Sequence, residues 1–215
     1  MGSERRTGVE GLTGDVLIRP AATIILVSDP GGDPSVLMGQ RGKGAVFMPR
    51  KYVFPGGRVD DADHKTALES ALDDRTSYLL QQRVDEHIAP EAFAVAALRE
   101  LEEETGLKFR PSEVAALRFF LRAITPPGRP RRFDARFFIA PAEALEGGVY
   151  AQYSDTEELS DLQWVRLADF EGLDIAPVTR MVLEFLSDHL PSMETPERVP
   201  LVRRDRIEDQ VVWLS

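Results

Sequence analysis

The sequence predicts a single domain of the α+β class, a mixed sandwich of helices and strands. Three observations support this fold class. Strand-like apolar runs occupy the first quarter of the chain, helical periodicity dominates the middle, and further strand-like segments follow without regular strand–helix alternation. With 215 residues, 43% of them hydrophobic and 29% charged, the chain has the length and composition of one folded domain.

The first expected elements are short strands bounded by glycine and proline: residues 21–27, 35–41 and 52–54. The first two flank a turn-forming segment and are expected to pair as a hairpin. The third stops at Pro55, because proline lacks a backbone donor and the glycines that follow permit positive φ. We therefore expect exposed backbone carbonyls at Gly56 and Gly57.

Two regions of helical periodicity follow. Apolar residues recur among charged residues over 64–87, which predicts one or two amphipathic helices. Pro90 suits the first turn of another helix over 91–105, and Gly106 stands where helices commonly end.

The remaining elements are strands and one further helix. Alternating, β-branched or aromatic residues predict three strands, near 114–123, 132–140 and 162–166. A core helix is expected over 176–190, where apolar residues recur at helical spacing. The tail over 191–215 is charged and rich in proline until residues 211–214, which we expect to dock on the body of the domain.

Composition excludes several classes of protein. The chain carries 26 basic and 36 acidic residues, and a net charge of −10 disfavours nucleic-acid and anionic-membrane partners. No apolar run approaches the roughly 18 residues that span a bilayer, and the first residues lack the apolar segment of a signal peptide. Because the chain has no cysteine, disulfides, thiol catalysis and cysteine-based zinc sites are excluded. We expect a cytoplasmic protein.

One expected helix ends in an unusual cluster of acids. On a helix, Glu100, Glu103 and Glu104 fall within an arc of about 100°, and Glu102 falls outside it. A charge run usually marks a solvated face. Here, however, each like-charged pair costs roughly 0.2–0.5 kcal/mol, and the last turn of a helix favours cations. A divalent cation bound by carboxylate oxygens would reverse this cost, so we expect Mg²⁺ or Mn²⁺.

The same stretch resembles the signature of Nudix hydrolases, G-x5-E-x7-R-E-U-x-E-E-x-G-U, in which U is aliphatic. The matching residues are Arg99, Glu100, Leu101, Glu103, Glu104, Gly106 and Leu107. Glu91 stands eight residues before Arg99, as the signature requires, but the position six residues before Glu91 is Asp85 instead of glycine. The expected glycine lies in the upstream segment 54–57, so the chain is similar to Nudix enzymes with an interrupted signature.

The resemblance implies an α/β/α sandwich with a mixed β-sheet, formed by residues 1–215 as one Nudix domain with a helical insertion over 58–90. It also implies metal-dependent hydrolysis of a diphosphate linkage in a small molecule. By the family pattern the metal ligands are Gly56, through its carbonyl, and Glu100, Glu103 and Glu104. The catalytic group is Glu100, Glu103 and Arg99; Glu100 is either a third carboxylate ligand or the base for water, and Arg99 holds a glutamate in register.

Other residues are weaker candidates for the site. Family members often recruit a later acid, and Glu157 or Glu158 is a candidate, although a solvated surface acid is an equal reading. Candidates for phosphate binding are Arg41, Arg58, Arg131 and Arg132; each is alternatively an ordinary surface or ion-pair residue. Residues assigned no part in the chemistry are Glu91, taken as structural, His64, His87 and His189, on helix faces, and Phe133, Phe137 and Phe138, in the core.

Three functions are compatible with this resemblance. The first is hydrolysis of a nucleoside diphosphate linked to another moiety. The second is hydrolysis of coenzyme A or its thioesters, because the interrupted signature is similar to that of the peroxisomal coenzyme A diphosphatases. The coenzyme A motif of other Nudix proteins agrees at Leu37, Arg41 and residues 54–57, but it fails at Gly42, Val46 and Arg50. The third is a catalytically silent module that binds a nucleotide.

The helical insertion is expected to pack its apolar side chains against other parts of the protein. Leucines and Val84 over 64–87 are expected to be buried, so the insertion would shape the substrate pocket or a dimer contact. Passive surface elaboration is the alternative, since loops tolerate long insertions at small entropic cost. A homodimer is compatible with the family.

Overall fold

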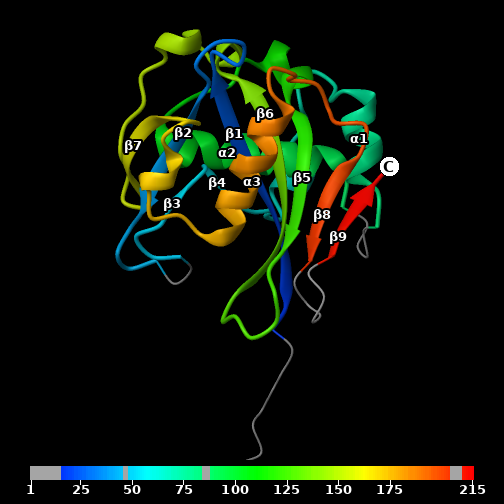
Figure 1. The fold of residues 1–215 in the computed structure, drawn as a ribbon. Helices are drawn as coiled ribbons and strands as arrows, with labels where there is room; N and C mark the ends of the chain where they lie inside the picture. The colour runs from blue at the N-terminus through cyan, green and yellow to red at the C-terminus, as the bar shows by residue number, and fades with distance from the viewer. Residues whose placement is uncertain (1–15, 46–47, 84–87, 204–209) are drawn as a thin grey trace, which may run out of the picture.

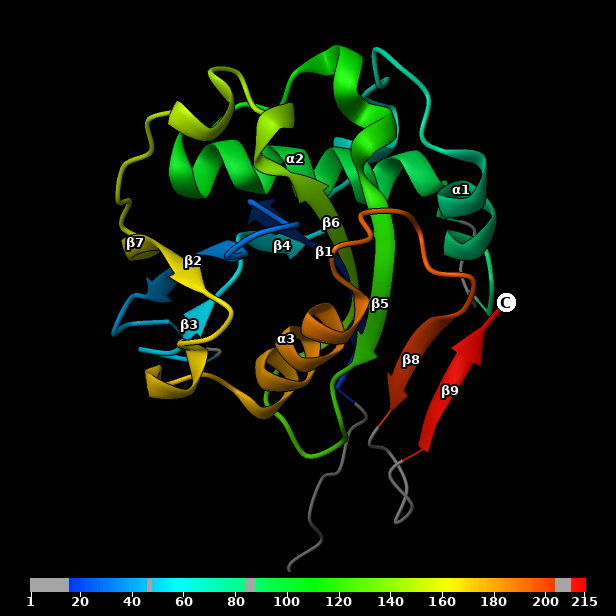
Figure 2. The same ribbon diagram turned by 45° about the horizontal axis from the view of Figure 1, so that its top comes forward.

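The computed structural model describes residues 16–45, 48–83, 88–203 and 210–215. A mixed β-sheet lies at the centre, with α2 (Pro90–Thr105) on one face and α3 (Pro177–His189) on the other (Figures 1 and 2). Each helix packs on its own buried apolar cluster. The expected α/β/α sandwich is therefore confirmed.

The described part of the chain contributes nine strands to one sheet: β1 (Ile18–Ser28), β2 (Ser35–Arg41), β3 (Tyr52–Val53), β4 (Gly56–Arg58), β5 (Arg118–Ile124), β6 (Arg132–Pro141), β7 (Leu159–Arg166), β8 (Val199–Arg203) and β9 (Gln210–Leu214). The strand order is β3-β2-β1-β6-β5-β8-β9, with β4 paired to β1 and β7 paired to β2. The pairs β1/β6 and β5/β8 are parallel, whereas the other pairs are antiparallel.

Strand β1 is the axis of the sheet, and it is longer than the expected 21–27. One of its edges pairs with β6 throughout, while its other edge pairs first with β4 and then with β2 as the predicted hairpin. Alternate β1 side chains point to opposite faces, as the strand period requires. Ala22, Ile24 and Leu26 lie in the cluster under α2, whereas Ile25 and Val27 lie in the cluster under α3.

Helix α2 agrees with its prediction. Pro90 occupies the first turn, where its missing N–H has no helical partner, and Gly106 ends the helix with a left-handed φ of 75°. Phe93, Ala97 and Leu101 are fully buried against the sheet. The acidic arc borders this buried face, and Glu104 lies within it beside β4.

The insertion is less helical than its periodicity predicts. It contains a single short turn of 3-10 helix, η1 (Asp63–Lys65), and the seven-residue helix α1 (Asp74–Leu80), while residues 84–87 lie outside the described residues. Asp73 accepts a hydrogen bond from Thr76 N–H (2.9 Å) and so starts α1 as its cap. Leu72, Leu79 and Leu80 are buried in the α2-side cluster. Val84, expected to be buried with them, is among the residues that are not described.

The carboxyl-terminal half needs two corrections. The strand expected near 114–123 begins only at Arg118, because residues 111–116 form the 3-10 helix η2 (Pro111–Ala116). Strand β8 was not anticipated within the charged, proline-containing tail; it forms because β5 supplies a parallel partner. β9 then pairs with β8, which confirms that residues 211–214 dock on the domain. Three further 3-10 turns are η3 (Ala142–Ala144), η4 (Gly148–Tyr150) and η5 (Phe170–Gly172).

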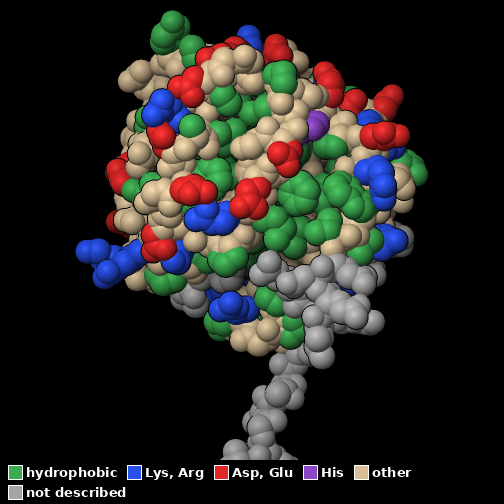
Figure 3. All heavy atoms as spheres, viewed as in Figure 1, with side chains coloured by type: hydrophobic (Ala, Val, Ile, Leu, Met, Phe, Trp, Pro, Cys, Tyr) green, Lys and Arg blue, Asp and Glu red, His purple; other side chains and the backbone are tan. Residues whose placement is uncertain are grey.

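The face that carries α3 has acidic and basic side chains interspersed over its surface (Figure 3). Apolar side chains gather between α3 and the last strands, where Phe185 and Trp213 make an edge-on ring contact with centroids 6.2 Å apart. Among the described residues, no helix combines the length and the apolar character needed to cross a bilayer.

Candidate active site

Strand β4 is the first part of the site, and its pairing with β1 decides where its backbone points. Ile24 N–H donates to Pro55 O (3.0 Å), and Val59 N–H donates to Pro20 O (3.0 Å). In an antiparallel pair, residues that bond across the pair alternate with residues that do not. The N–H and C=O groups of Gly56 therefore point away from β1.

Helix α2 uses the backbone groups that β4 leaves free. Gly56 N–H donates to Glu104 Oε2 (2.8 Å), and Arg58 O accepts from Arg99 Nη2 (3.1 Å). The strand expected over 52–54 does end before Pro55, but the sequence does not predict that residues 56–58 return to the sheet as β4 beside β1. The glycines are thus held in a strand whose free edge faces the acidic side of α2.

Both glycines lie close to neighbouring atoms. A Cβ on Gly56 would lie 2.5 Å from Ala22 O, and a Cβ on Gly57 would lie 2.2 Å from Glu100 Oε1. Backbone leaves no room for a side chain at position 56, and a side chain at position 57 would displace the Glu100 carboxylate. The pair therefore lets Glu100 lie directly over β4.

Arg99 is the central cation of the cluster. Its Nη1 donates to Glu100 Oε1 (2.9 Å) and to Glu103 Oε2 (2.9 Å). Its Nε and Nη2 donate to the two carboxylate oxygens of Asp63, at 3.0 and 3.1 Å. These bonds raise the pKa of Arg99 above its ordinary value, those from Asp63 most strongly. Arg99 pairs with two glutamates at once.

Asp63 is the site residue that sequence reasoning missed. Its side chain is 2% exposed and also accepts a hydrogen bond from Asp60 N–H (2.8 Å). Burial alone would raise the pKa of Asp63, but the bonds from Arg99 and Asp60 outweigh it, so the pKa lies below its ordinary value. The carboxylate is held ionised against the guanidinium.

The position of Asp63 corrects the reading of the signature. Asp63 stands six residues after Gly57, which is the spacing that the signature gives between its glycine and its first acid. Glu91 lies exposed in the first turn of α2, so its spacing to Arg99 is a coincidence of numbering. The interruption therefore begins after Asp63, and a Gly57-x5-Asp63 match would have been the signal that found it.

The three glutamates of the acidic arc differ in environment. The Glu104 side chain is almost fully buried, and burial raises its pKa to about 7, against the opposing hydrogen bond from Gly56 N–H. Burial also raises the pKa of Glu100, and the charge and hydrogen bond of Arg99 offset part of this increase. The Glu103 side chain is 57% exposed. One helix turn thus carries a buried, a half-buried and an exposed carboxylate.

A loop before β7 brings a fourth carboxylate to this cluster. The negative charge of Glu158 acts on both Glu100 and Glu104, raising the pKa of each. Glu158 O accepts from Gly42 N–H (3.2 Å), so the loop also lies against the end of β2. Glu157 precedes it on the same exposed turn. Of the two candidate acids, Glu158 is therefore the one whose charge acts on the glutamates of α2.

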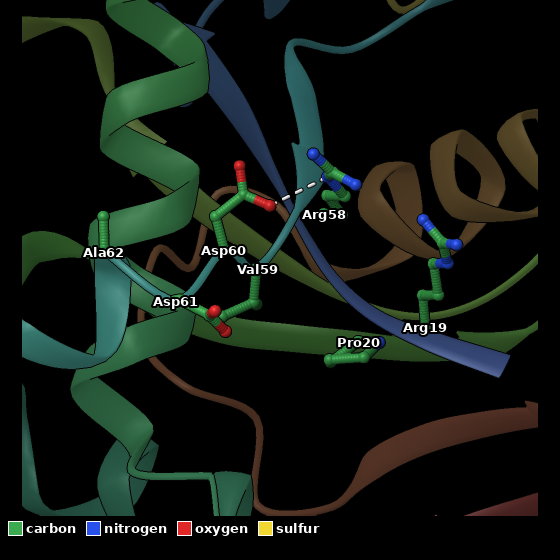
Figure 4. Close-up of a pocket in the computed structure, with 7 residues that line it drawn as sticks. All are labelled: Arg19, Pro20, Arg58, Val59, Asp60, Asp61 and Ala62. Carbon is green, nitrogen blue, oxygen red and sulfur yellow. Dashed lines mark ion pairs between the residues drawn. The ribbon is translucent and has the colours of Figure 1, made fainter.

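The candidate arginines are not equivalent. Arg41 lies close enough to Glu104 to lower its pKa, and its Nε is buried without a hydrogen-bond partner among the described residues. Arg58 pairs with Asp60 (2.8 Å) and lines an open cavity of about 520 Å³ next to the site, together with Arg19 (Figure 4). Arg132 Nε instead donates to Thr125 O (3.0 Å) within the β5–β6 turn.

The remaining aromatic, histidine and arginine candidates lie in the core or on the surface. Phe137 and Phe138 are buried in the core, and Phe133 is half-buried. His64 is exposed, and His189 contacts Phe120 at a ring distance of 5.5 Å. Arg131 is exposed beside the β5–β6 turn, and His87 lies outside the described residues.

The donor chemistry fits a hard divalent cation, because all of the acidic groups supply carboxylate oxygens. In the described part of the chain, no three acidic or histidine side chains already converge as a metal site. The cation that bridges Glu100 and Glu103 in this structure is Arg99, and Glu104 is held by Gly56 N–H.

Fold and site together define a class of protein: an α/β/α sandwich whose helix α2 presents carboxylates to a glycine strand. The family model described as the NUDIX domain matches residues 17–184. The chain belongs to the NUDIX family.

Individual relatives agree with this assignment. The chain is 38% identical over 89 residues to "Putative nudix hydrolase 7" of Caenorhabditis elegans; the match covers 41% of this chain and only 22% of that relative. It is similar to a NUDIX hydrolase structure from Alicyclobacillus acidocaldarius, with a TM-score of 0.60 and 25% identity over 80% of this chain and 92% of that one. The MutT protein structure from Methanosarcina mazei Go1 shares the fold, with a TM-score of 0.54 and 16% identity over 82% and 98% of the chains.

Proposed function

We propose that this protein hydrolyses the diphosphate linkage of a nucleoside diphosphate joined to another moiety, in a reaction that depends on Mg²⁺ or Mn²⁺. The proposal is carried by the burial of Glu104 on α2, where the charges of Glu100 and Glu158 act on it, in a chain of the NUDIX family. Buried like charges are costly unless a cation or a proton neutralises them. A metal-binding role explains why the chain keeps them together.

In this proposal the metal ligands are Glu100, Glu103 and Glu104, with the carbonyl of Gly56 completing the set. That carbonyl belongs to a residue whose backbone points away from β1. When bound, the metal would neutralise the diphosphate and lower the pKa of an attacking water. Ionised Glu104 would be favoured by such a cation, since opposite charge lowers a raised pKa.

The proton of the attacking water needs an acceptor within hydrogen-bond reach. Glu100 and Glu103 are the candidates for this base, and both are held by Arg99 Nη1. We assign Arg99 to positioning, because its five donors are engaged by Asp63, the two glutamates and a backbone carbonyl. Glu158 is proposed as an additional acid facing the same cluster.

Arg41 and Arg58 are proposed to bind the substrate phosphates. A buried donor without a partner costs about 1–3 kcal/mol, so the orphaned Nε of Arg41 suits a group that a bound anion completes. Arg58 lines the cavity beside the site, a volume within the usual range for small-molecule pockets. Arg132 stays a weaker candidate, because its Nε is used in a turn.

Two alternatives follow from specific features. Coenzyme A or acyl-coenzyme A is the second substrate class, favoured by the interrupted signature and by Leu37 and Arg41. A catalytically silent nucleotide-binding module is the third possibility; it is disfavoured because the acids of the signature are all present.

The proposal also covers partners and location. We propose a small-molecule diphosphate as the only substrate class, with no nucleic-acid or membrane partner, and a cytoplasmic setting compatible with the cysteine-free sequence. A homodimer is proposed from the resemblance; exposed Val211 and Trp213 on the edge strand β9 favour it. Light scattering of the purified chain tests the assembly state.

The test of the function is a screen of nucleotide sugars, dinucleoside polyphosphates and coenzyme A with added Mg²⁺ or Mn²⁺, analysed by identifying both products. Hydrolysis in ¹⁸O-labelled water should place the label in one phosphate-containing product, since a metal-polarised phosphorus is the expected electrophile. Label found only in a product without phosphate would contradict the reaction class. Nucleotide binding without turnover of any of these compounds would favour the silent module.

A further inference from the structure

Strand β7 contains a bulge next to the acidic cluster. Met38 pairs with Gln163 and Gln40 pairs with Ser160, so β7 carries one more residue than β2 over this interval. Asp161, in the bulge, has a positive φ of 50°. Bulges leave backbone groups without ladder partners and commonly occur beside active sites. The amides of the bulge therefore need acceptors from elsewhere.

Gly39 of β2 makes room for the bulge. A Cβ at position 39 would lie 2.5 Å from the Leu159 side chain and 2.8 Å from the Leu162 side chain, both of which are buried. The irregularity is thus built into both strands. It is a feature of the packed core and is not confined to a surface loop.

Asp155 supplies the missing acceptors. Its Oδ2 accepts from Asp161 N–H (2.8 Å), and its Oδ1 accepts from Leu162 N–H (3.0 Å). These two bonds lower the pKa of Asp155, so the side chain is a carboxylate at neutral pH. Hydrogen bonds from backbone amides to an ionised carboxylate are stronger than those to a neutral acceptor. Asp155 thereby closes residues 155–162 into a clamped loop.

The acid-bearing turn lies inside this loop. Thr156 N–H donates to Leu159 O (2.8 Å), and Leu159 N–H donates to Thr156 Oγ1 (3.1 Å). Residues 157 and 158 are therefore the two central positions of a tight turn. Because the turn has two bonds across its base, the carboxylate of Glu158 projects from a defined backbone.

The turn is also attached to the helix that carries the other acids. Ser154 N–H donates to Thr105 O (3.0 Å), and Thr156 Oγ1 lies 3.3 Å from Glu104 O as a donor. The last carbonyls of a helix have no helical partner, and here the loop satisfies them. These two bonds attach the turn that carries Glu158 to the last residues of α2, Glu104 and Thr105.

We propose that Asp155 is a positioning residue for the site: by clamping the β7 bulge it fixes the turn that carries Glu158 beside the carboxyl end of α2. Thr156 assists by joining the turn to α2. The inference rests on the proposed function for its activity readout, but the geometry of the clamp can be measured without turnover.

The test is a double-mutant cycle between Asp155→Asn and Glu158→Gln. Asparagine keeps the shape and one acceptor oxygen, but its amide group would face an N–H donor. We expect Asp155→Asn to lower kcat about tenfold with a smaller change in KM, and to weaken Mn²⁺ binding severalfold, measured by electron paramagnetic resonance of free Mn²⁺. In a Glu158→Gln background the same change should have no further effect on either quantity, because coupled residues are not additive.

Controls separate positioning from general stability. Asp169→Asn is the matched variant, since Asp169 is an exposed carboxylate that binds Arg166 at the other end of β7; kcat and Mn²⁺ affinity should be unchanged. Thr156→Val perturbs the same loop and replaces Asp155→Asn in the test if that variant does not fold. It should likewise lower kcat and Mn²⁺ affinity in the wild type and have no further effect in the Glu158→Gln background. Hydrogen exchange at the amides of residues 161 and 162 should become faster in Asp155→Asn.

The outcomes discriminate clearly. The inference would be overturned if Asp155→Asn lowered kcat by the same factor in the Glu158→Gln background as in the wild type. It would also be overturned if Asp155→Asn left the Mn²⁺ affinity unchanged. If the wild-type protein hydrolysed no diphosphate, the proposed function would fail, whereas Mn²⁺ binding and hydrogen exchange in the same variants would still decide the role of Asp155.

Discussion

Asp63 and Arg99 form a two-point ion pair, with N–O distances of 3.0 and 3.1 Å, across 36 residues of sequence. Asp63 precedes the inserted segment, and Arg99 lies at the centre of the carboxylate helix. The pair therefore joins the start of the insertion to Glu100 and Glu103, which Arg99 holds through its other nitrogen. The insertion therefore starts from a fixed point in the site.

Asp63→Asn should destabilise the protein and lower its turnover. Removing one partner of a buried ion pair costs about 3–5 kcal/mol, because the other charge is left without full compensation. Arg99 would also lose the contact that fixes it between the two glutamates, so kcat should fall. Urea unfolding and steady-state kinetics measure the two effects. Asp61→Asn, at an exposed neighbouring position, should change neither, and equal behaviour of both variants would argue against the role of Asp63.

Activity should require added Mg²⁺ or Mn²⁺, and Glu103→Gln should lower turnover by orders of magnitude. The Glu103 side chain is 57% exposed, so the variant should keep its fold, as measured by circular dichroism. The physical reason is the loss of one anionic oxygen from a set that binds a hard cation. Turnover that persists in excess chelator would exclude the metal mechanism.

Metal-free stability should depend on the ionisation of Glu104. Its pKa is raised to about 7 in the folded protein, mainly by burial, and it is faced by Glu100, Glu158, Arg41 and the N–H of Gly56. Between the unfolded value of 4.5 and about 7, the folded state binds more protons than the unfolded state. The free energy of unfolding should therefore fall as the pH rises through this window, by roughly 3 kcal/mol, and then level off.

Glu104→Gln isolates this contribution, because glutamine can still accept from Gly56 N–H but does not ionise. The variant should gain stability relative to the wild type at pH 8 and not at pH 4.5, measured by urea unfolding with chelator present. Divalent metal should raise the melting temperature of the wild type more than that of the variant, since binding to the native state adds stability. A difference between the two proteins that does not vary with pH would contradict the assignment.

The insertion should prove essential for folding. Leu79 is fully buried, so Leu79→Ala should lower the free energy of unfolding by about 2–5 kcal/mol. Replacing residues 64–87 with a short Gly/Ser linker removes Leu72, Leu79 and Leu80 from the core and should abolish cooperative unfolding. Glu69→Ala, at an exposed position of the same segment, should have little effect. A stable, cooperative linker variant would show that the insertion is a passive elaboration.

Several parts of the molecule could be predicted from the sequence because they depend on local chemistry. The hairpin of β1 and β2 follows from apolar runs around a turn, and α2 follows from its period, its proline and its terminal glycine. The acidic arc also follows, since residues three and four apart share a helix face. The signature could therefore be recognised along the chain before any contact was known.

The tertiary structure decided the features that join distant segments. Asp63, and not Glu91, reaches Arg99, because the chain folds back beside α2 directly after β4. Strand β8 exists because β5 offers it an edge, which no local preference of the tail reveals. Glu91 has the spacing to Arg99 that the signature requires, but the acid that pairs with Arg99 in the structure is Asp63.

The same limit applies within the acidic arc itself. Glu103 and Glu104 are neighbours on one helix, and their spacing predicts only that both lie near a common face. Glu104 is buried under β4 and the loop of Glu158, whereas Glu103 points largely into solvent. Helical geometry placed the two carboxylates near a common face of α2. Packing against segments about 50 residues away in either direction then determined which carboxylate is buried and so has its pKa raised.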